Sequence, residues 1–176
     1  MATSELRGTL RIDASPGAKR FQGVWLEHAD GTRWVIDYRA RELWTWFADH
    51  DVIVTGGTYA PQGQAINALH FRIETLRFAK PEFGRGPYLS MGPEQLMGGA
   101  FVTETALPGS KLAGSSWRAF VDDAGTHYIV VGEELDPRRG SGPISVRARV
   151  LEPDMSYTAR TSGPDLWIVA IEDETD

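Results

Sequence analysis

The chain contains one short motif twice, and this repetition constrains its fold more than any other feature. Residues 14–19 read ASPGAK and residues 106–111 read ALPGSK, which places Pro16 and Pro108 92 positions apart. Because several other segments match in the same order, at offsets that drift by only a few residues, two copies of one unit are expected. The other matching pairs are RGT (7–9) with GGA (98–100), GT (31–32) with GT (125–126), WVI (34–36) with YIV (128–130), VIVTGGTYAP (52–61) with ISVRARVLEP (144–153), and HFRIETL (70–76) with DLWIVAI (165–171).

The matches place the first unit at residues 1–78 and the second at residues 96–176, where the chain ends in an acidic tail. Residues 79–95 lie between them and contain three prolines and three glycines, which is typical of a linker. A continuous β-sandwich in which the repeat arose by chance is the alternative.

Each unit is expected to be built mainly from short strands. Apolar residues alternate with polar ones in most of the strand candidates, and glycines precede the first strand of each copy, where they indicate a bend. Residues 40–50 instead have apolar side chains at helical spacing. The expected strands of the first unit are 9–13, 23–28, 33–39, 51–59 and 70–78.

The order of three strands, a helix and two more strands, with a glycine bend early in the first strand, resembles the OB-fold. That fold is a five-stranded Greek-key barrel. The resemblance covers both halves, although residues 132–142 predict a loop where the second copy would have its helix. It implies a mainly β fold class, with two tandem OB-like barrels and one short helix in the first.

Composition excludes several classes of function. The absence of cysteine rules out disulfides, thiol catalysis and thiolate metal sites, and it fits a reducing, cytoplasmic location. No apolar run is long enough for a membrane helix and the first residues lack the pattern of a secretory signal, so no membrane partner is expected. The net charge of −6 divides into +1 for residues 1–80 and −7 for residues 81–176, so only the first half suits a phosphate backbone.

No motif indicates catalysis or a cofactor. The four histidines, His28, His50, His70 and His127, are not at metal-ligand spacing. The serines lack the nucleophile-elbow pattern, and the glycine-rich stretches lack the lysine and the following helix of a phosphate-binding loop. The sequence therefore predicts no catalytic residue, no metal site and no cofactor.

The resemblance implies a ligand-binding face on the second and third strands of the first unit, framed by two loops. An aromatic ring beside basic groups on such a face suits single-stranded nucleic acid, because bases stack on the ring and cations follow the backbone. The alternative is that Trp25 packs against the linker or the second unit. The candidate residues are Trp25, Arg33, Asp37 and Arg39 on the strands, Lys19 and Arg20 in the first loop, and Gln62, Gln64 and Asn67 in the other.

The leading functional hypothesis is a non-catalytic binding or adaptor protein whose partner is another protein. Single-stranded nucleic-acid binding by the first barrel is one alternative, and an enzyme with a site between the barrels is another. A fourth hypothesis is that the acidic second unit blocks a basic partner. Trp46, which cannot share the core-facing side of the helix, is expected either to plug the barrel end or to anchor a partner.

Overall fold

The computed structural model describes residues 4–14, 22–63, 66–80, 83–84, 86–132, 142–156 and 164–172. Within them the chain is mainly β with one short helix, as the sequence predicts. The first half contains β1 (Ser4–Ala14), β2 (Gln22–Glu27), β3 (Arg33–Asp37), α1 (Glu42–Thr45), β4 (Asp51–Thr58) and β5 (Leu69–Phe78). The second half contains β6 (Tyr88–Thr105), β7 (Ser116–Asp122), β8 (His127–Val131), β9 (Ile144–Pro153) and β10 (Asp165–Glu172).

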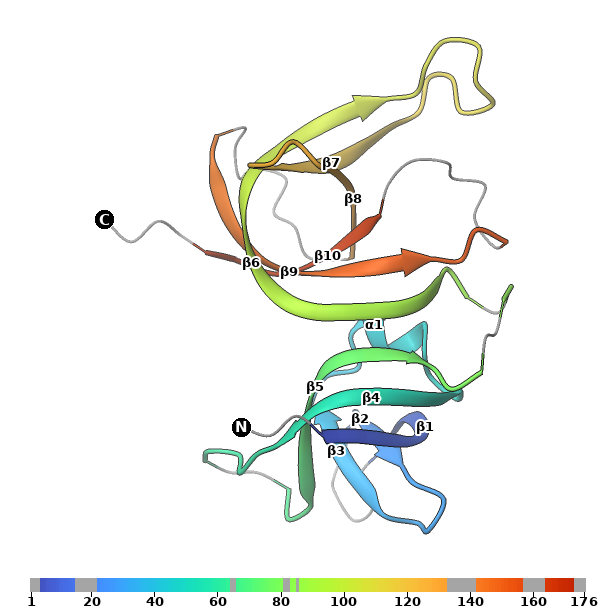
Figure 1. Ribbon diagram of the computed structural model, residues 1–176, viewed down its shortest axis with the longest axis vertical. Helices are drawn as coiled ribbons and strands as arrows, with labels where there is room; N and C mark the ends of the chain where they lie inside the picture. Colours follow the sequence, from blue (N-terminus) through green and yellow to red (C-terminus); the bar gives the residue numbers. More distant parts are fainter. Residues whose placement is uncertain are drawn as a thin grey trace.

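The strand pairings close into two rings, which makes the architecture barrel-like. The first ring has the order β3-β2-β1-β4-β5, and parallel pairing of β3 with β5 closes it. The second has the order β6-β7-β8-β10-β9, and antiparallel pairing of β6 with β9 closes it. Antiparallel pairing of β5 with β6 joins the rings, and Figure 1 shows them stacked with α1 between them.

The residues that match in the sequence occupy the same register in the two rings. Gly8 of β1 pairs with Val52 of β4, and Gly99 of β6 pairs with Ile144 of β9. The parallel pairs correspond in the same way, Val35 with His70 in the first ring and Ile129 with Asp165 in the second. The same connectivity is therefore accompanied by the same hydrogen-bonding positions.

Two of the predicted bend glycines are required by close backbone approach. A Cβ atom on Gly8 would lie less than 3.0 Å from the carbonyl oxygen of Glu27. A Cβ atom on Gly99 would lie less than 3.0 Å from the carbonyl oxygen of Val121, at the corresponding place in the second ring. Only glycine allows the first strand of each ring to bend this tightly against the second.

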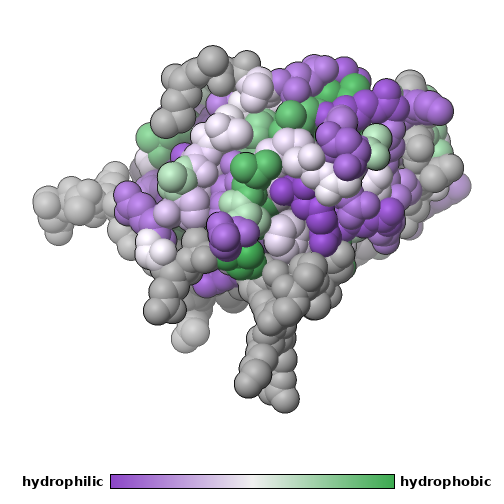
Figure 2. Space-filling view, turned by 90° about the horizontal axis from the view of Figure 1, so that it is seen from below, coloured by the Kyte–Doolittle hydropathy of each residue, from purple (hydrophilic) through white to green (hydrophobic). Residues whose placement is uncertain are grey.

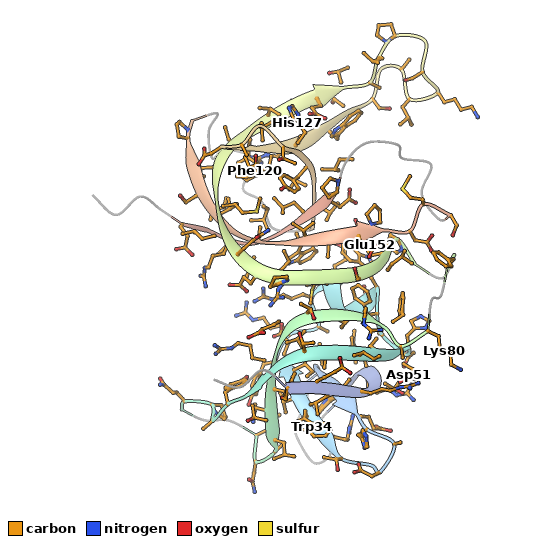
Figure 3. All side chains as sticks on the ribbon, viewed as in Figure 1. Trp34, Asp51, Lys80, Phe120, His127 and Glu152 are labelled. Atoms are coloured by element: carbon orange, nitrogen blue, oxygen red, sulfur yellow. The ribbon has the colours of Figure 1, made fainter. Side chains whose placement is uncertain are left out.

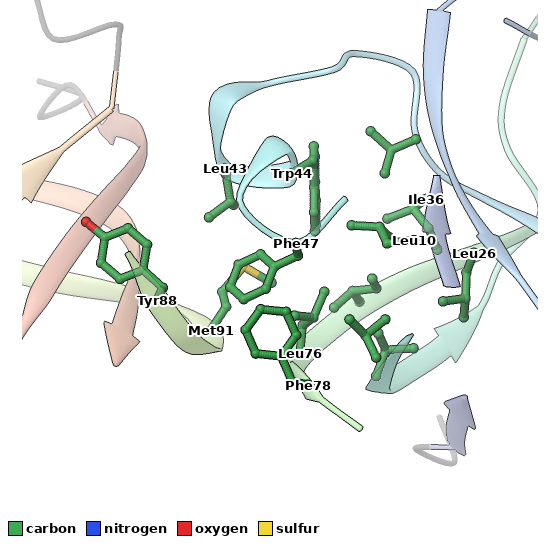
Figure 4. Close-up of a cluster of buried hydrophobic side chains, with 14 of the residues drawn as sticks. Leu10, Leu26, Ile36, Leu43, Trp44, Phe47, Leu76, Phe78, Tyr88 and Met91 are labelled. Atoms are coloured by element: carbon green, nitrogen blue, oxygen red, sulfur yellow. The ribbon is translucent and has the colours of Figure 1, made fainter. Parts of the chain in front are cut away.

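Each ring encloses apolar side chains, and the larger core extends across the junction. The second ring has its own cluster around Phe120, which is fully buried (Figure 3). The first core contains Leu10, Leu26 and Phe47 together with Met91 from β6, as Figure 4 shows. Three further residues of the second half belong to this core: Tyr88, Leu151 and Trp167. The rings therefore share buried apolar surface.

The segment expected to be a linker is in part a strand. Residues 88–95 belong to β6, whose 18 residues pair with both β5 and β9. The register of β6 against β9 shifts between Met91 and Glu94, where Gly92 and Pro93 lie. An irregularity of this kind accommodates a proline inside a strand. The presence of Pro93 therefore did not exclude a strand at these residues.

The helix and the neighbouring Trp46 also differ from expectation. The helix predicted over residues 40–50 is limited to Glu42–Thr45, and turns follow it. Trp46 does not stand free as an anchor: it is partly buried against the first core, and its ring centroid lies 4.6 Å from that of Tyr88 and 5.6 Å from that of Trp167. It fills space between the rings. The loop predicted at 132–142 lies largely outside the described residues.

Candidate binding cleft between the two rings

The predicted aromatic platform is covered. Trp25 lies on the outer side of β2, away from the first core, but only 3% of the residue is exposed. The guanidinium of Arg33 lies 4.6 Å from the centroid of the Trp25 ring, and Arg33 also pairs with Glu27 at 3.5 Å. The indole Nε1 has no hydrogen-bond partner among the described residues. In this conformation the Trp25 ring therefore presents no open face for stacking.

The other predicted site residues are distributed over different surfaces. Arg39 is exposed just after β3 and lines a cleft at the junction of the rings, which Trp25 and Arg33 do not line. Gln62 and Asn67 are exposed between β4 and β5. The predicted residues Lys19, Arg20 and Gln64 lie outside the described residues. The end of the first ring seen in Figure 2 is mainly hydrophilic, with small hydrophobic patches.

The cleft consists of two adjoining cavities between the rings. The first has a volume of about 260 Å³ and lies between residues 39–42, which lead into α1, and residues 167–171 of β10. The second has a volume of about 200 Å³ and is walled by the end of β3, by α1, and by side chains of β5, β6 and β9. Arg41, Trp167 and Val169 line both cavities, so the two cavities are neighbours that share a wall.

Asp37 holds the wall of the cleft in place. One of its carboxylate oxygens accepts a hydrogen bond from Trp44 Nε1 at 2.9 Å, and the other accepts one from the backbone N–H of Arg39 at 2.9 Å. The Nε atom of Arg41 lies 3.7 Å from the first of these oxygens. Since one carboxylate contacts three residues of the segment that follows β3, this segment has a defined path from the strand into α1.

Arg149 fixes the opposite wall. Its guanidinium donates to the carbonyl oxygens of Ile73 at 3.0 Å, Glu74 at 2.8 Å and Gly92 at 3.1 Å, and it lies 3.8 Å from a carboxylate oxygen of Glu94. Burial lowers the pKa of Arg149, while the negative charges of Glu94 and Glu74 oppose this effect. An arginine of the second ring is thus bound to the backbone of the first.

The cleft holds a small excess of positive charge in an otherwise acidic chain. Its lining arginines are Arg39, Arg41, Arg72 and Arg149, and its lining carboxylates are Asp37, Glu42 and Glu94. Arg41 and Arg149 have carboxylate partners, as given above. Arg39 and Arg72 form no ion pair with any residue that the structure describes. Two guanidinium groups therefore face the cleft without a neutralising partner there.

Tyr59 supports Arg72 beside the second cavity. The Arg72 guanidinium lies 5.2 Å from the centroid of the Tyr59 ring. Burial raises the pKa of Tyr59, with smaller contributions from Tyr38 and Asp37, so its hydroxyl stays protonated and can donate a hydrogen bond. Behind it, His70 Nδ1 donates to the carbonyl oxygen of Ala68 at 2.9 Å, and His70 Nε2 lies 2.6 Å from the hydroxyl of Tyr38. The centroids of the Tyr59 and His70 rings lie 5.5 Å apart, so Tyr59 is packed from behind on this side of the cleft.

Sequence reasoning named Arg39 and Asp37, and it raised a site between the barrels only as part of the enzyme hypothesis, without naming the other residues that line it. Arg41, Arg72 and Arg149 come from three separate segments and carry no motif. Alternation along β5 marks Arg72 as facing away from the core, but it does not say what the side chain faces.

Comparisons with protein-family models, with curated proteins and with solved structures found no match. In the described part of the chain, no cluster of three or more histidine, aspartate or glutamate side chains could hold a metal ion. No helix among the described residues is long and apolar enough to cross a membrane.

Proposed function

We propose that the chain is a non-catalytic binding protein, made of two tandem OB-like barrels, whose partner is another protein. The support for the tandem barrels is the identical order of the two rings, their matching register and the matching bend glycines. Small closed barrels of this kind commonly serve as binding modules. Because fold alone does not determine function, the argument for the partner rests on the cleft.

The observation that carries the proposal is the size and lining of the two cavities. At about 260 and 200 Å³, each is smaller than the roughly 300 Å³ at which small-molecule sites begin. Each is better suited to single side chains of a partner than to a whole cofactor. Arginine, tyrosine and tryptophan line the cleft, and these residue types are enriched where proteins bind one another.

The nucleic-acid alternative receives less support from the same structure. Stacking of bases needs an open aromatic face, and the Trp25 ring is buried beneath Arg33. Three carboxylates also line the cleft, where they would repel a phosphate backbone. A protein partner can place a neutral or positive group beside them.

The test is affinity capture with a variant that fills the cleft. Ala40 is exposed and lines the first cavity, so Ala40→Trp should block it without disturbing a core. Ala124→Trp, in the exposed turn between β7 and β8, is the matched control. We expect wild type and Ala124→Trp to retain the same polypeptide from cells that express the protein, and Ala40→Trp to lose it. Retention that Ala40→Trp leaves unchanged, or no retained polypeptide at all, would show the proposal to be wrong.

A further inference from the structure

Two of the arginines that line the cleft, Arg39 and Arg72, differ from most of the other described arginines. Elsewhere the described arginines usually have carboxylate partners: Arg7 pairs with Asp51 at 2.5 Å and Arg11 pairs with Asp49 at 2.7 Å. The chain carries 24 acidic against 18 basic side chains, so carboxylates are in excess. Arg39 and Arg72 nevertheless face the cleft without an ion pair among the described residues. Their position suits an acidic group supplied from outside the chain.

We infer that the cleft binds carboxylate side chains of an acidic segment of the partner protein, through Arg39 in the first cavity and Arg72 in the second. This inference rests on the proposed function, and it names the chemistry of the partner. Each cavity has room for a side chain, and the two cavities lie next to each other, with Arg41, Trp167 and Val169 lining both. One extended acidic segment can therefore occupy both.

The setting of Arg72 suits a carboxylate. A guanidinium over an aromatic ring keeps its N–H groups at its edge, where they can donate to both oxygens of one carboxylate. The protonated hydroxyl of Tyr59 is a further donor nearby. Arg39 lines the neighbouring cavity with Arg41, whose charge is partly balanced by Asp37.

The carboxylates of the cleft favour a peptide over a nucleic acid as the occupant. Asp37, Glu42 and Glu94 line the same walls. A nucleic-acid strand would bring a phosphate at every nucleotide against them, whereas a peptide can separate its acidic side chains by neutral ones.

The inference can be tested with a short synthetic peptide in which glutamate alternates with serine. The matched peptide with glutamine in place of glutamate is the uncharged control. Trp44 and Trp167 line the cleft, so tryptophan fluorescence can follow binding, and calorimetry provides a second measurement. We expect the glutamate peptide to bind, the glutamine peptide to bind at least tenfold more weakly, and affinity for the glutamate peptide to fall with added salt.

Three variants locate the interaction. We expect Arg39→Gln and Arg72→Gln each to weaken binding of the glutamate peptide by about tenfold, because each removes a hydrogen bond between charged groups. Arg77→Gln changes another exposed arginine of β5 that does not line the cleft, and it should leave the affinity unchanged. Equal effects of all three substitutions, or no binding by wild type, would overturn the inference.

The experiments distinguish failure of this inference from failure of the proposed function. Capture that Ala40→Trp abolishes but Arg39→Gln and Arg72→Gln leave intact would retain the cleft as a protein site and reject the acidic partner. Capture unaffected by Ala40→Trp would reject the proposed function itself. A thymidine oligonucleotide that binds more tightly than the peptide, with the same dependence on Arg39 and Arg72, would overturn the inference in favour of nucleic acid.

Discussion

Replacing Arg149 with methionine should measure how strongly the two rings are held together. Methionine keeps most of the apolar stem but removes the donors that reach Ile73, Glu74 and Gly92. Each of these three hydrogen bonds is worth about 1 kcal/mol net, so their loss amounts to about 3 kcal/mol. Carbonyl groups left buried without a partner raise the cost toward about 5 kcal/mol. We therefore expect Arg149→Met to lower the free energy of unfolding by about 3–5 kcal/mol.

The matched control is Arg147→Met, on the same strand. Arg147 is 49% exposed at its side chain and pairs with Glu94 and Glu172 near the surface. Exposed pairs of this kind contribute less than about 1 kcal/mol. The assay is urea unfolding followed by tryptophan fluorescence and by far-ultraviolet circular dichroism. If Arg149→Met cost no more than Arg147→Met, the argument that Arg149 joins the rings would be refuted.

Two further predictions concern the bend glycines and one surface carboxylate. Gly8→Ala places a Cβ atom against the backbone of β2 and should lower the free energy of unfolding, measured in urea, by about 1–3 kcal/mol. Gly57→Ala is the control, because a Cβ atom there meets nothing within 4 Å, and it should be neutral or slightly stabilising. Equal effects of the two substitutions would contradict the close approach at Gly8. A backbone hydrogen bond from Thr32 is the main cause that lowers the pKa of Asp30 from 3.8 to about 2. The contribution of Asp30 to stability should be complete above pH 3.8 and lost as the pH falls through about 2. An NMR titration in which this carboxyl titrated near 3.8 would count against the assignment.

The fold class could largely be predicted from the sequence, because strand patterns and glycines are local signals. In β2 the sequence alternates, and Val24 and Leu26 lie in the first core as that alternation predicts. The pairing of Gly8 with Val52 and of Gly99 with Ile144 follows segments that match in the sequence. These features depend on residues whose environment is set by their own strand and its neighbour.

The lining of the cleft and the burial of Trp25 could not be predicted in the same way. Alternation correctly places Trp25 on the side of β2 away from the core, but only the three-dimensional path of Arg33 shows that the ring is covered. Composition likewise predicted a linker at 79–95, whereas pairing with β9 makes the end of that segment a strand. Arg72 lies near the segment around Arg41 because β5 pairs with β3, and Arg149 lies near it only because the rings pack together.

The double pairing of β6 determines how the cleft can respond to a partner. Met91 lies opposite Leu76 of β5 on one side and opposite Leu151 of β9 on the other. Opening the cleft as a hinge would break backbone hydrogen bonds of a strand shared by both rings. If the cleft binds a protein as proposed, we expect it to be preorganised, so that little conformational entropy is lost on association. Substitutions in the cleft should then change the dissociation rate constant of a partner far more than its association rate constant.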